Sequence, residues 1–206
     1  MCADLTLIRT ADDTIEVSVT TSQQAQTLAA RLRQSRIAED VVAGLESVAV
    51  HFEPSQALAV EAFIHKQKLP PAEPSNTTKI TEIGVEYGGE NGPDFTSVCD
   101  ALNLSPEAFI ALHCGQVHIV EMIGFTPGFA YLSGLPETFK IPRLANPRPR
   151  LPAGSVGISA NFTGIYALDG PGGWPLIGRT TTKLFELNND PPFLLQPGQR
   201  VQFRSV

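Results

Sequence analysis

The sequence predicts a small α+β domain followed by a larger, mainly β domain whose sheet is closed or sandwiched. Residues 1–69 contain one glycine and one proline, whereas the other sixteen of each lie beyond residue 69. The last helical pattern ends near Gly115, and from Val117 onward short apolar segments are separated by Gly/Pro turns. The proline-rich stretch 70–76 suits a linker. We therefore place the two domains at residues 1–75 and 76–206.

The N-terminal domain is expected to combine short strands with two amphipathic helices. The segment 14–19 alternates apolar and polar residues, as a half-buried strand does. The first helix places its apolar residues on one face, with Ser22 as the N-cap. The predicted elements, in order, are strands at 5–8 and 14–19, a helix from residue 22 to about residue 32, a strand at 48–50 and a helix at about 55–67.

The second domain is expected to begin with a strand and two helices before it becomes all β. A helix over 91–104 is entered through Gly92, Pro93 and Asp94, and the next begins at Ser105 with proline at its first position. The predicted strands lie at 83–87, 117–122, 155–159, 163–166, 176–177, 183–187 and 200–204. Many short strands separated by turns are typical of a barrel or a sandwich.

The composition is that of a globular protein with an acidic balance. The 206 residues carry a formal net charge of -6, and no run approaches the roughly 20 apolar residues of a membrane helix. The first residues lack the pattern of a signal peptide, so we expect a cytoplasmic protein without a membrane partner. Cys2, Cys99 and Cys114 are odd in number and form no C-x-x-C pair, so we expect neither a disulfide framework nor a metal site.

Charge is distributed unevenly along the chain. Residues 1–123 hold 7 Lys/Arg and 17 Asp/Glu, a net of -10, whereas residues 124–206 hold 8 and 4, a net of +4. Between Glu137 and Asp169 no carboxylate side chain occurs, but three arginines do: Arg143, Arg148 and Arg150. Clustered guanidinium groups without acidic partners favour a small anion such as phosphate or carboxylate. The acidic total and the lack of a nucleic-acid motif lead us to expect no nucleic-acid partner.

Three blocks rich in Gly, Pro, aromatic residues and Arg lie between residues 124 and 180. They are residues 124–132 (GFTPGFAYL), residues 142–155 and residues 171–180 (PGGWPLIGRT). Glycine and proline define the backbone shape of such loops. The chain contains no phosphate-binding loop, dinucleotide fingerprint, nucleophile elbow or zinc-protease motif. The blocks therefore predict a ligand site that uses arginine rather than one of these common catalytic motifs.

The aromatic and histidine candidates each have a structural alternative. His113, near the end of a predicted helix, is either a site residue or a cation that interacts favourably with the helix dipole. Tyr131 is the aromatic residue that we most expect to show its polar end in a pocket, whereas Phe125 is expected in the core. Trp174 either caps the barrel or forms a pocket wall.

The arginine candidates have two interpretations as well. Arg143, Arg148 and Arg179 are either solvated or ligand-binding, and their burial decides between these. In a semi-enclosed site an arginine–anion hydrogen bond contributes about 1.5 to 3 kcal/mol, far more than an exposed pair. Residues 88–92 (GGENG) could hold an anion with backbone N–H groups, but a tight turn is the favoured interpretation.

The motifs together resemble the B subunit of bacterial ATP-dependent 5-oxoprolinase, also called allophanate hydrolase subunit 1 and represented by the kinase inhibitor KipI. The resemblance covers essentially the whole chain and implies a small α+β domain followed by a cyclophilin-like β-barrel. Its specific parts are VEYGG with GPD (85–94), His113, GFTPGFAYL (124–132), PAGSVGI (152–158), TGIY (163–166), PGGWPLIGRT (171–180) and LQPGQRVQF (195–203).

The resemblance also implies an activity, partners and residue roles. It implies that this chain, inactive alone, works with a C subunit and an A subunit to open 5-oxoproline to glutamate with ATP hydrolysis, leaving open which of the three chains holds ATP. Arg143, Arg148 and Arg179 are then expected to stabilise phosphoryl charge, with His113 or Tyr131 transferring a proton. The residues expected to contact the ligand or nucleotide are Gly128, Gly172, Gly173, Trp174 and Thr180.

The chain departs from the family pattern in one place that bears on substrate choice. Asn161-Phe162 stands where the family usually has Pro-Gln before TGIY. Phenylalanine cannot make the hydrogen bonds of a glutamine amide, so either the ligand differs or this position serves packing. A related amide or a carboxyl-transfer substrate, as in urea carboxylases, is one alternative. A KipI-like regulator that binds a sensor histidine kinase without chemistry is another.

Overall fold

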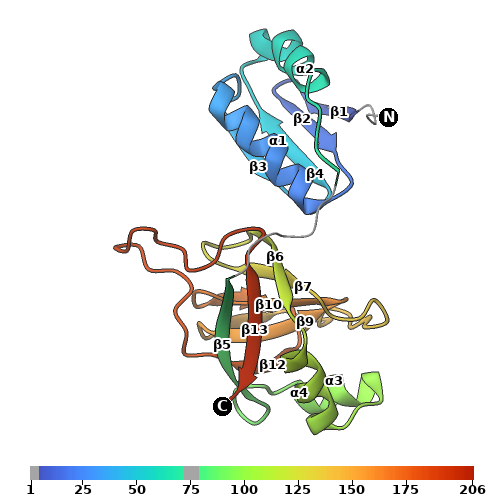
Figure 1. Ribbon diagram of the computed structural model, residues 1–206, viewed down its shortest axis with the longest axis vertical. Helices are drawn as coiled ribbons and strands as arrows, with labels where there is room; N and C mark the ends of the chain where they lie inside the picture. The colour runs from blue at the N-terminus through green and yellow to red at the C-terminus, as the bar shows by residue number, and fades with distance from the viewer. Residues whose placement is uncertain (1–4, 72–78) are drawn as a thin grey trace. The chain divides into compact units, whose positions relative to one another are not determined.

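The chain separates into two compact units, residues 1–76 and 77–206 (Figure 1). The computed structural model describes residues 5–71 and 79–206. The domain boundary that we place between residues 75 and 76 lies outside the described residues, as does most of the predicted linker.

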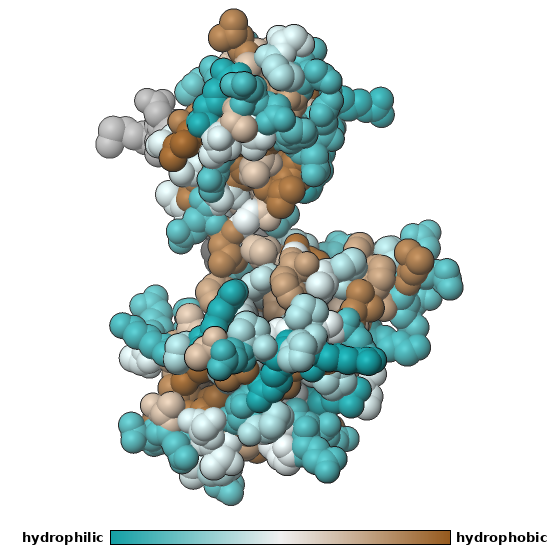
Figure 2. All heavy atoms as spheres, turned by 180° about the vertical axis from the view of Figure 1, so that it is seen from behind, coloured by the Kyte–Doolittle hydropathy of each residue, from teal (hydrophilic) through white to brown (hydrophobic). Residues whose placement is uncertain are grey.

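Among the residues that the structure describes, buried hydrophobic residues form one cluster in the first unit and two in the second. The cluster of the first unit joins β-strand and helix residues, among them Val17, Leu28 and Val50, and the larger cluster of the second unit joins residues of the barrel strands and of the helices beside them. On the face shown in Figure 2, hydrophobic side chains occur as separate patches among hydrophilic ones. The hydrophobic effect thus stabilises each unit through clusters of its own.

Within residues 5–71, four antiparallel strands form a sheet in the order β1-β2-β4-β3, with two helices that contribute to its core (Figure 1). The strands are β1 (Thr6–Ala11), β2 (Thr14–Ser18), β3 (Asp40–Ala43) and β4 (Ser47–His51). The helices are α1 (Ser22–Ser35) and α2 (Ala57–His65), the latter preceded by a 3-10 turn over Pro54–Gln56. The short β3 was not predicted, because its four residues (DVVA) are too few to show a clear alternation of apolar and polar side chains.

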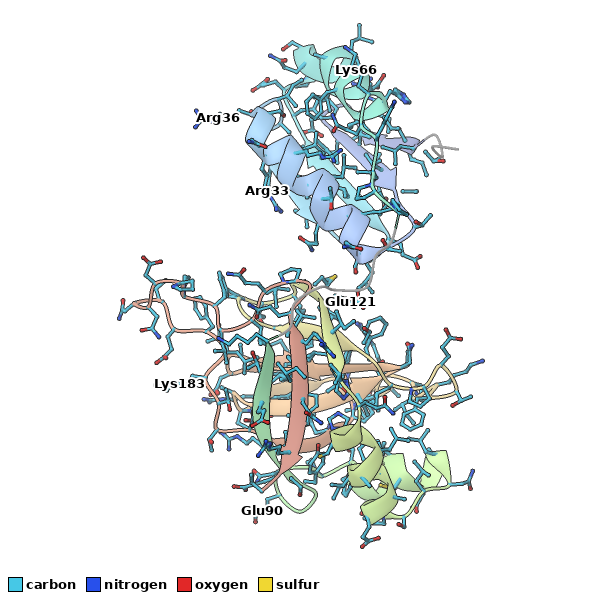
Figure 3. The ribbon with its side chains drawn as sticks, in the orientation of Figure 1. Arg33, Arg36, Lys66, Glu90, Glu121 and Lys183 are labelled. Carbon is cyan, nitrogen blue, oxygen red and sulfur yellow. The ribbon has the colours of Figure 1, made fainter. Side chains whose placement is uncertain are left out.

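Helix α1 is fixed at both ends by side chains. The N-cap is Thr21, whose hydroxyl accepts the Gln24 N–H at 3.3 Å, so our choice of Ser22 is wrong by one residue. At the other end, Arg33 in the last turn donates to the carbonyl oxygen of Val41 at 2.6 Å, and Figure 3 shows Arg33 and Arg36 there. A cation in this position interacts favourably with the helix dipole and also ties α1 to β3.

Within residues 79–206, seven strands close into a barrel in the order β10-β7-β6-β13-β5-β12-β9 (Figure 1). The pair β13·β5 is parallel, and the other pairs are antiparallel. The closed, mainly β architecture is thus confirmed. Its strands are β5 (Ile80–Tyr87), β6 (His118–Ile123), β7 (Ala130–Ser133), β9 (Ser155–Ser159), β10 (Phe162–Ile165), β12 (Leu176–Arg179) and β13 (Arg200–Ser205). A separate ribbon pairs β8 (Arg148–Leu151) with β11 (Gly170–Gly172).

Helices α3 (Phe95–Leu102) and α4 (Pro106–Gly115) pack against the barrel core through Phe95 and Phe109. The predicted start of α4 is confirmed, because Ser105 caps it and proline stands in its first turn. The predicted helix at 91–104 is too long, since residues before Phe95 form a turn. The favoured turn at 88–92 is confirmed: both Gly88 and Gly89 have positive φ, and the Gly92 N–H donates to the Gly88 carbonyl at 2.8 Å.

The C-terminal part of the chain contains the largest errors of strand prediction. The segment 183–187 is not a strand, because only an isolated bridge joins Phe185 to Phe193. Strands β7, β8 and β11 were not predicted; β8 and β11 are three or four residues long and contain proline, which lacks the N–H that a ladder needs.

Gly154→Ala is expected to destabilise the barrel unit by about 2 to 4 kcal/mol. Gly154 has a φ of 83°, and an added Cβ would run into the carbonyl oxygen of Thr180, so the cost combines left-handed strain with overpacking. Urea denaturation followed by tryptophan fluorescence reports this unit, because Trp174 is the one tryptophan of the chain. Gly170→Ala is the control, since nothing lies within 4 Å of a Cβ there. Equal midpoints for the two variants would contradict the prediction.

Candidate functional site

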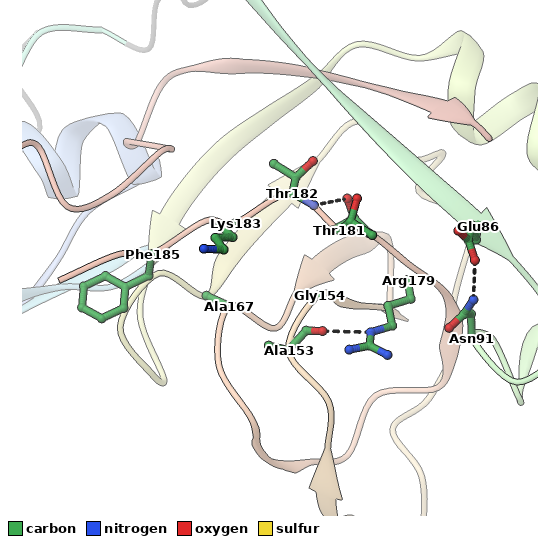
Figure 4. A pocket seen from close by; sticks show the side chains of 11 residues that line it. Glu86, Asn91, Ala153, Gly154, Ala167, Arg179, Thr181, Thr182, Lys183 and Phe185 are labelled. Atoms are coloured by element: carbon green, nitrogen blue, oxygen red, sulfur yellow. Dashed lines mark hydrogen bonds between the residues drawn. The ribbon is translucent and has the colours of Figure 1, made fainter. Parts of the chain in front are cut away.

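A pocket of about 430 Å³ lies at one edge of the barrel (Figure 4). Its wall is formed by the end of β12 with the segment that follows, by β5, and by the loop that precedes β9. The polar side chains that line it are Glu86, Asn91, Arg179, Thr180, Thr181, Thr182 and Lys183. The pocket is therefore lined by positively charged, negatively charged and hydroxyl side chains.

Arg179 is the last residue of β12, where the strand reaches the pocket. It stands directly opposite Glu86 of β5 in the antiparallel ladder. The Arg179 Nε donates to the carbonyl oxygen of Ala153 at 3.0 Å, which orients the guanidinium along the loop before β9 (Figure 4). Because this bond uses one of five N–H donors, the rest of the guanidinium can bind a ligand.

The chain after Arg179 is held in place by backbone contacts. The Thr180 N–H donates to Gly154 O at 2.9 Å, and the buried Thr180 hydroxyl accepts the Thr182 N–H at 3.1 Å. A hydroxyl that accepts one bond can still donate its own proton. Lys183 is paired with Glu186 at 2.9 Å, so its charge is already largely balanced.

A second group of predicted residues lies around a buried aromatic cluster. We use this name for Phe129, Leu151, Tyr166, Trp174 and Leu176, with Tyr131 and Phe162 partly buried against them. The Trp174 ring is 5.7 Å from the rings of both Phe129 and Tyr131, in edge-on geometry. The predicted Tyr131 and Trp174 are thus brought together, with Trp174 in the cluster rather than in the pocket wall.

Tyr166 lies against the segment 172–174. Burial raises the pKa of Tyr166, while backbone N–H groups of Trp174 and Gly173 and the charge of Arg143 oppose this rise. A Cβ on Gly172 would lie 2.6 Å from the Tyr166 hydroxyl, so only glycine allows this approach. Burial likewise raises the pKa of Tyr131, and Arg143 again opposes the rise. Both phenols therefore stay protonated at neutral pH beside an exposed arginine.

Arg148 is partly exposed, and both of its Nη atoms are engaged by a carboxylate of the same unit. Its two Nη atoms each donate to one carboxylate oxygen of Asp94 at 2.8 Å, a bidentate pair between residues 54 positions apart. Asp94 also accepts the Leu176 N–H at 2.7 Å. Burial acts to raise the pKa of Asp94, but these donors together outweigh it and lower that pKa. The guanidinium fork of Arg148 thus ties β8 to the start of α3 and to β12.

His113 lies in the barrel core. It is fully buried, its Nδ1 lies 2.6 Å from the Tyr87 hydroxyl and its Nε2 lies 3.0 Å from the Thr163 hydroxyl. The Phe203 ring stacks on it at 4.4 Å. Burial holds the pKa of His113 well below its ordinary value, so the alternative of a cation at the helix end is wrong. Both ring nitrogens have hydroxyl partners, and a neutral ring is satisfied.

Comparison with known proteins identifies the family. The family model described as "Carboxyltransferase domain, subdomain C and D" matches residues 2–195. The 5-oxoprolinase B subunit of Escherichia coli O157:H7 is 38% identical over 191 residues, which are 91% of this chain and 87% of that protein. The chain belongs to the family of 5-oxoprolinase B subunits. The resemblance inferred from the sequence blocks is confirmed.

Other members of this family match over shorter regions. The 5-oxoprolinase B subunit of Bacillus subtilis (strain 168) is 47% identical over 125 residues, 61% of this chain and 52% of its own length. The aligned region thus spans about half of that relative.

Solved structures share the fold over nearly the whole chain. The crystal structure of TTHA0988 has a TM-score of 0.78 and 30% identity, and the match covers 94% of this chain and 40% of that one. The Kluyveromyces lactis urea carboxylase has a TM-score of 0.77 at 17% identity, covering 98% of this chain and 22% of that one. The second likeness shows the fold alone. No helix within residues 5–71 or 79–206 is long and apolar enough to span a membrane.

The structure divides the predicted site residues of this family member into three places. Arg179 and Thr180 line the pocket, and Gly128 lies near its Ala167 and Phe185. The aromatic cluster collects a second set: Tyr131, Arg143, Gly172, Gly173 and Trp174. His113 lies in the barrel core, and Arg148 lies in the ion pair with Asp94. The catalytic roles predicted for these two residues stay predictions, and their positions do not support them.

Two further positions correct or resolve the sequence interpretation. Phe125, expected in the core, is 61% exposed and has a φ of 66°, with its ring edge-on to Phe129 and Tyr166. A bulky residue with positive φ is a backbone outlier. Phe162, at the departure from the family pattern, packs against the aromatic cluster, which favours the packing interpretation of Asn161-Phe162.

The sequence reasoning overlooked Glu86, Asp94, Tyr166 and Lys183. Glu86 and Asp94 were visible as the charged residues of the VEYGG and GPD motifs, and Tyr166 as the end of TGIY. Nothing in the sequence indicated which charged side chains would lie next to each other, because the register of the strands and the paths of the loops determine those neighbours.

The stability of the barrel unit is expected to fall as the pH decreases from 7.5 to 5.5. Burial lowers the pKa of His113 and His118 in the folded state, whereas an unfolded histidine has a pKa near 6.5. The unfolded chain therefore binds more protons in this range, and the free energy of unfolding decreases as the pH falls. Urea denaturation followed at Trp174 measures this. An equal or higher midpoint at pH 5.5 would contradict it.

Proposed function

We propose that this chain is a non-autonomous subunit of an ATP-dependent 5-oxoprolinase that opens 5-oxoproline to glutamate together with C and A subunits. The observation that carries the proposal is the match to the E. coli relative along 91% of this chain and 87% of that protein. The pocket with Arg179 and the cluster with Arg143 supply cations suited to an anionic substrate. We place the complex in the cytoplasm and retain the cyclophilin-like description of the barrel as part of this proposal.

The chemistry that we propose explains the need for cations. A lactam is a poor electrophile, and transfer of the γ-phosphoryl group of ATP to the lactam oxygen releases ADP and activates the ring carbon. Water then adds to that carbon, and the ring C–N bond breaks with protonation of the nitrogen to leave an acyl phosphate. A second water hydrolyses this acyl phosphate to glutamate and inorganic phosphate. Cations stabilise the charge on the phosphoryl oxygens during transfer.

We assign these roles to residues by their positions. Arg143 is the candidate for phosphoryl contact, because it is exposed beside two protonated phenols. Tyr131 is the better candidate for proton transfer, since it is only partly buried whereas His113 has no exposed surface. Contacts to ATP from Gly128, Gly172, Gly173, Trp174 and Thr180 remain part of the proposal, in a complex whose ATP-holding chain is open.

A second candidate function is a KipI-like inhibitor that binds a sensor histidine kinase. The exposed Phe125, held with positive φ beside the aromatic cluster, favours a surface that binds another protein. The same surface suits a chain of an enzyme complex, so the residue alone does not choose between them.

Co-expression of the tagged chain with the two other subunits tests the proposal. We expect a complex of the three chains to elute together in size-exclusion chromatography. A chain that elutes alone in their presence, but binds and inhibits a sensor kinase, would contradict the enzyme assignment and support the regulator.

A further inference from the structure

The pocket is bordered by two opposite charges that do not pair with each other. Arg179 and Glu86 are direct partners across the β12·β5 ladder, and such partners have Cβ atoms about 5 Å apart on the same face. An ion pair between them is therefore sterically accessible. Instead, Arg179 donates to the Ala153 carbonyl, and Glu86 accepts the Asn91 amide N–H at 2.6 Å (Figure 4). Both charged groups remain at the pocket.

The neighbouring charges are already balanced. Lys183 is paired with Glu186, and Asp169 is held by Arg150 and by the Ala153 N–H. Within residues 5–71 and 79–206, neither Arg179 nor Glu86 has an ion-pair partner. Among the residues described, the pocket thus presents one unpaired cation and one unpaired anion, together with the hydroxyls of Thr180 and Thr182 in its lining.

This pair of charges selects a class of ligand. A phosphate would meet Arg179 but would be repelled by Glu86, because like charges at short range cost free energy. A small carboxylic acid with an N–H group next to its carboxylate satisfies both sides, since guanidinium groups bind carboxylates and a carboxylate accepts N–H donors. The volume of about 430 Å³ is within the range of small-molecule sites.

We propose that this pocket binds a small carboxylic acid that carries an N–H donor, with Arg179 and the adjacent threonine hydroxyls holding the carboxylate and Glu86 accepting the N–H. The ligand chemistry follows from the pocket. Its identity as 5-oxoproline, which has a carboxylate beside a lactam N–H, rests on the proposed function. Arg179 would then be a residue for substrate selection rather than for phosphoryl transfer.

Isothermal titration of the full chain with three ligands tests the inference, because the pocket is built from the second unit alone. We expect 5-oxoproline to bind, and both 2-pyrrolidone, which lacks the carboxylate, and N-methyl-5-oxoproline, which lacks the N–H, to bind about ten- to a hundredfold more weakly. Arg179→Gln should weaken 5-oxoproline by a similar factor and abolish its advantage over 2-pyrrolidone. Glu86→Gln should reduce its advantage over the N-methyl compound.

Arg204→Gln and Glu82→Gln are matched controls. Arg204 and Glu82 form an ion pair on the neighbouring strands β13 and β5 and do not line the pocket, so these variants should bind as the unaltered chain does. Absence of 5-oxoproline binding at about 10 mM ligand, which is about ten times the Kd of a 1 mM site, would overturn the inference. Equal binding of all three ligands would overturn it as well. Charge-dependent binding by a chain that supports no ATP-dependent glutamate release would instead uphold the inference and contradict the proposed function.

Discussion

Replacement of His113 by alanine is expected to destabilise the barrel unit by about 3 to 5 kcal/mol, the largest effect that we predict for a single side chain. The change removes a fully buried ring that stacks on Phe203 and leaves a cavity in the core. It also leaves the hydroxyls of Tyr87 and Thr163 without the ring nitrogens that they contact, and a buried polar group without a partner is costly.

His113→Phe separates packing from hydrogen bonding. Phenylalanine fills the space but offers no nitrogen, so we expect a loss of about 1 to 3 kcal/mol, set by the two hydroxyls alone. Urea denaturation at pH 7.5, followed by the fluorescence of Trp174, measures both variants, with the exposed His65→Ala in the first unit as a control. A His113→Ala chain as stable as the unaltered one would contradict the structural role. Full turnover by a complex that contains a folded His113→Phe chain would remove His113 from the proton-transfer candidates.

Asp94→Ala is expected to destabilise the barrel unit by about 2 to 4 kcal/mol, more than Arg148→Ala does. Asp94 accepts three N–H groups, two from Arg148 and one from Leu176, and its removal leaves all of them without this acceptor. Arg148→Ala leaves Asp94 with the Leu176 N–H, and the partial exposure of the pair allows water to compensate. We expect about 1 to 3 kcal/mol for Arg148→Ala.

The double variant distinguishes this pairing from independent effects. If Asp94 and Arg148 act on each other, the combined loss in urea denaturation is smaller than the sum of the two single losses. Additive losses, or a larger effect for Arg148→Ala than for Asp94→Ala, would contradict the interpretation. A reconstituted complex in which Arg148→Ala lowers turnover without lowering stability would restore a catalytic role for Arg148.

Local patterns in the sequence were sufficient for most elements and for the β-rich second unit. Alternation predicted β2, and the capped, proline-containing start predicted α4, because both signals come from neighbouring residues. The tight turn around Gly88 was equally local. Strand β7 was missed, although Tyr131 lies in it and Phe129 directly precedes it, since the glycines and proline before it suggested a loop.

The composition of the site was predictable, but its pairings were not. The excess of arginine in the second half of the chain pointed to Arg143 and Arg179, and both lie at surfaces where an anion could bind. Arg148 has the same sequence context, yet its guanidinium donates to the carboxylate of Asp94, which lies 54 residues earlier in the chain. His113 shows the same limit, because its burial results from contacts with Tyr87, Thr163 and Phe203, which come from three different strands.

The assignment of this chain to an ATP-dependent 5-oxoprolinase is tested most directly by glutamate release from 5-oxoproline in a mixture of the three purified subunits. The same assay is run without ATP and without this chain. We predict glutamate only when ATP and all three subunits are present. Glutamate release that does not need this chain, or no ATP-dependent release from the complete mixture, would contradict the assignment.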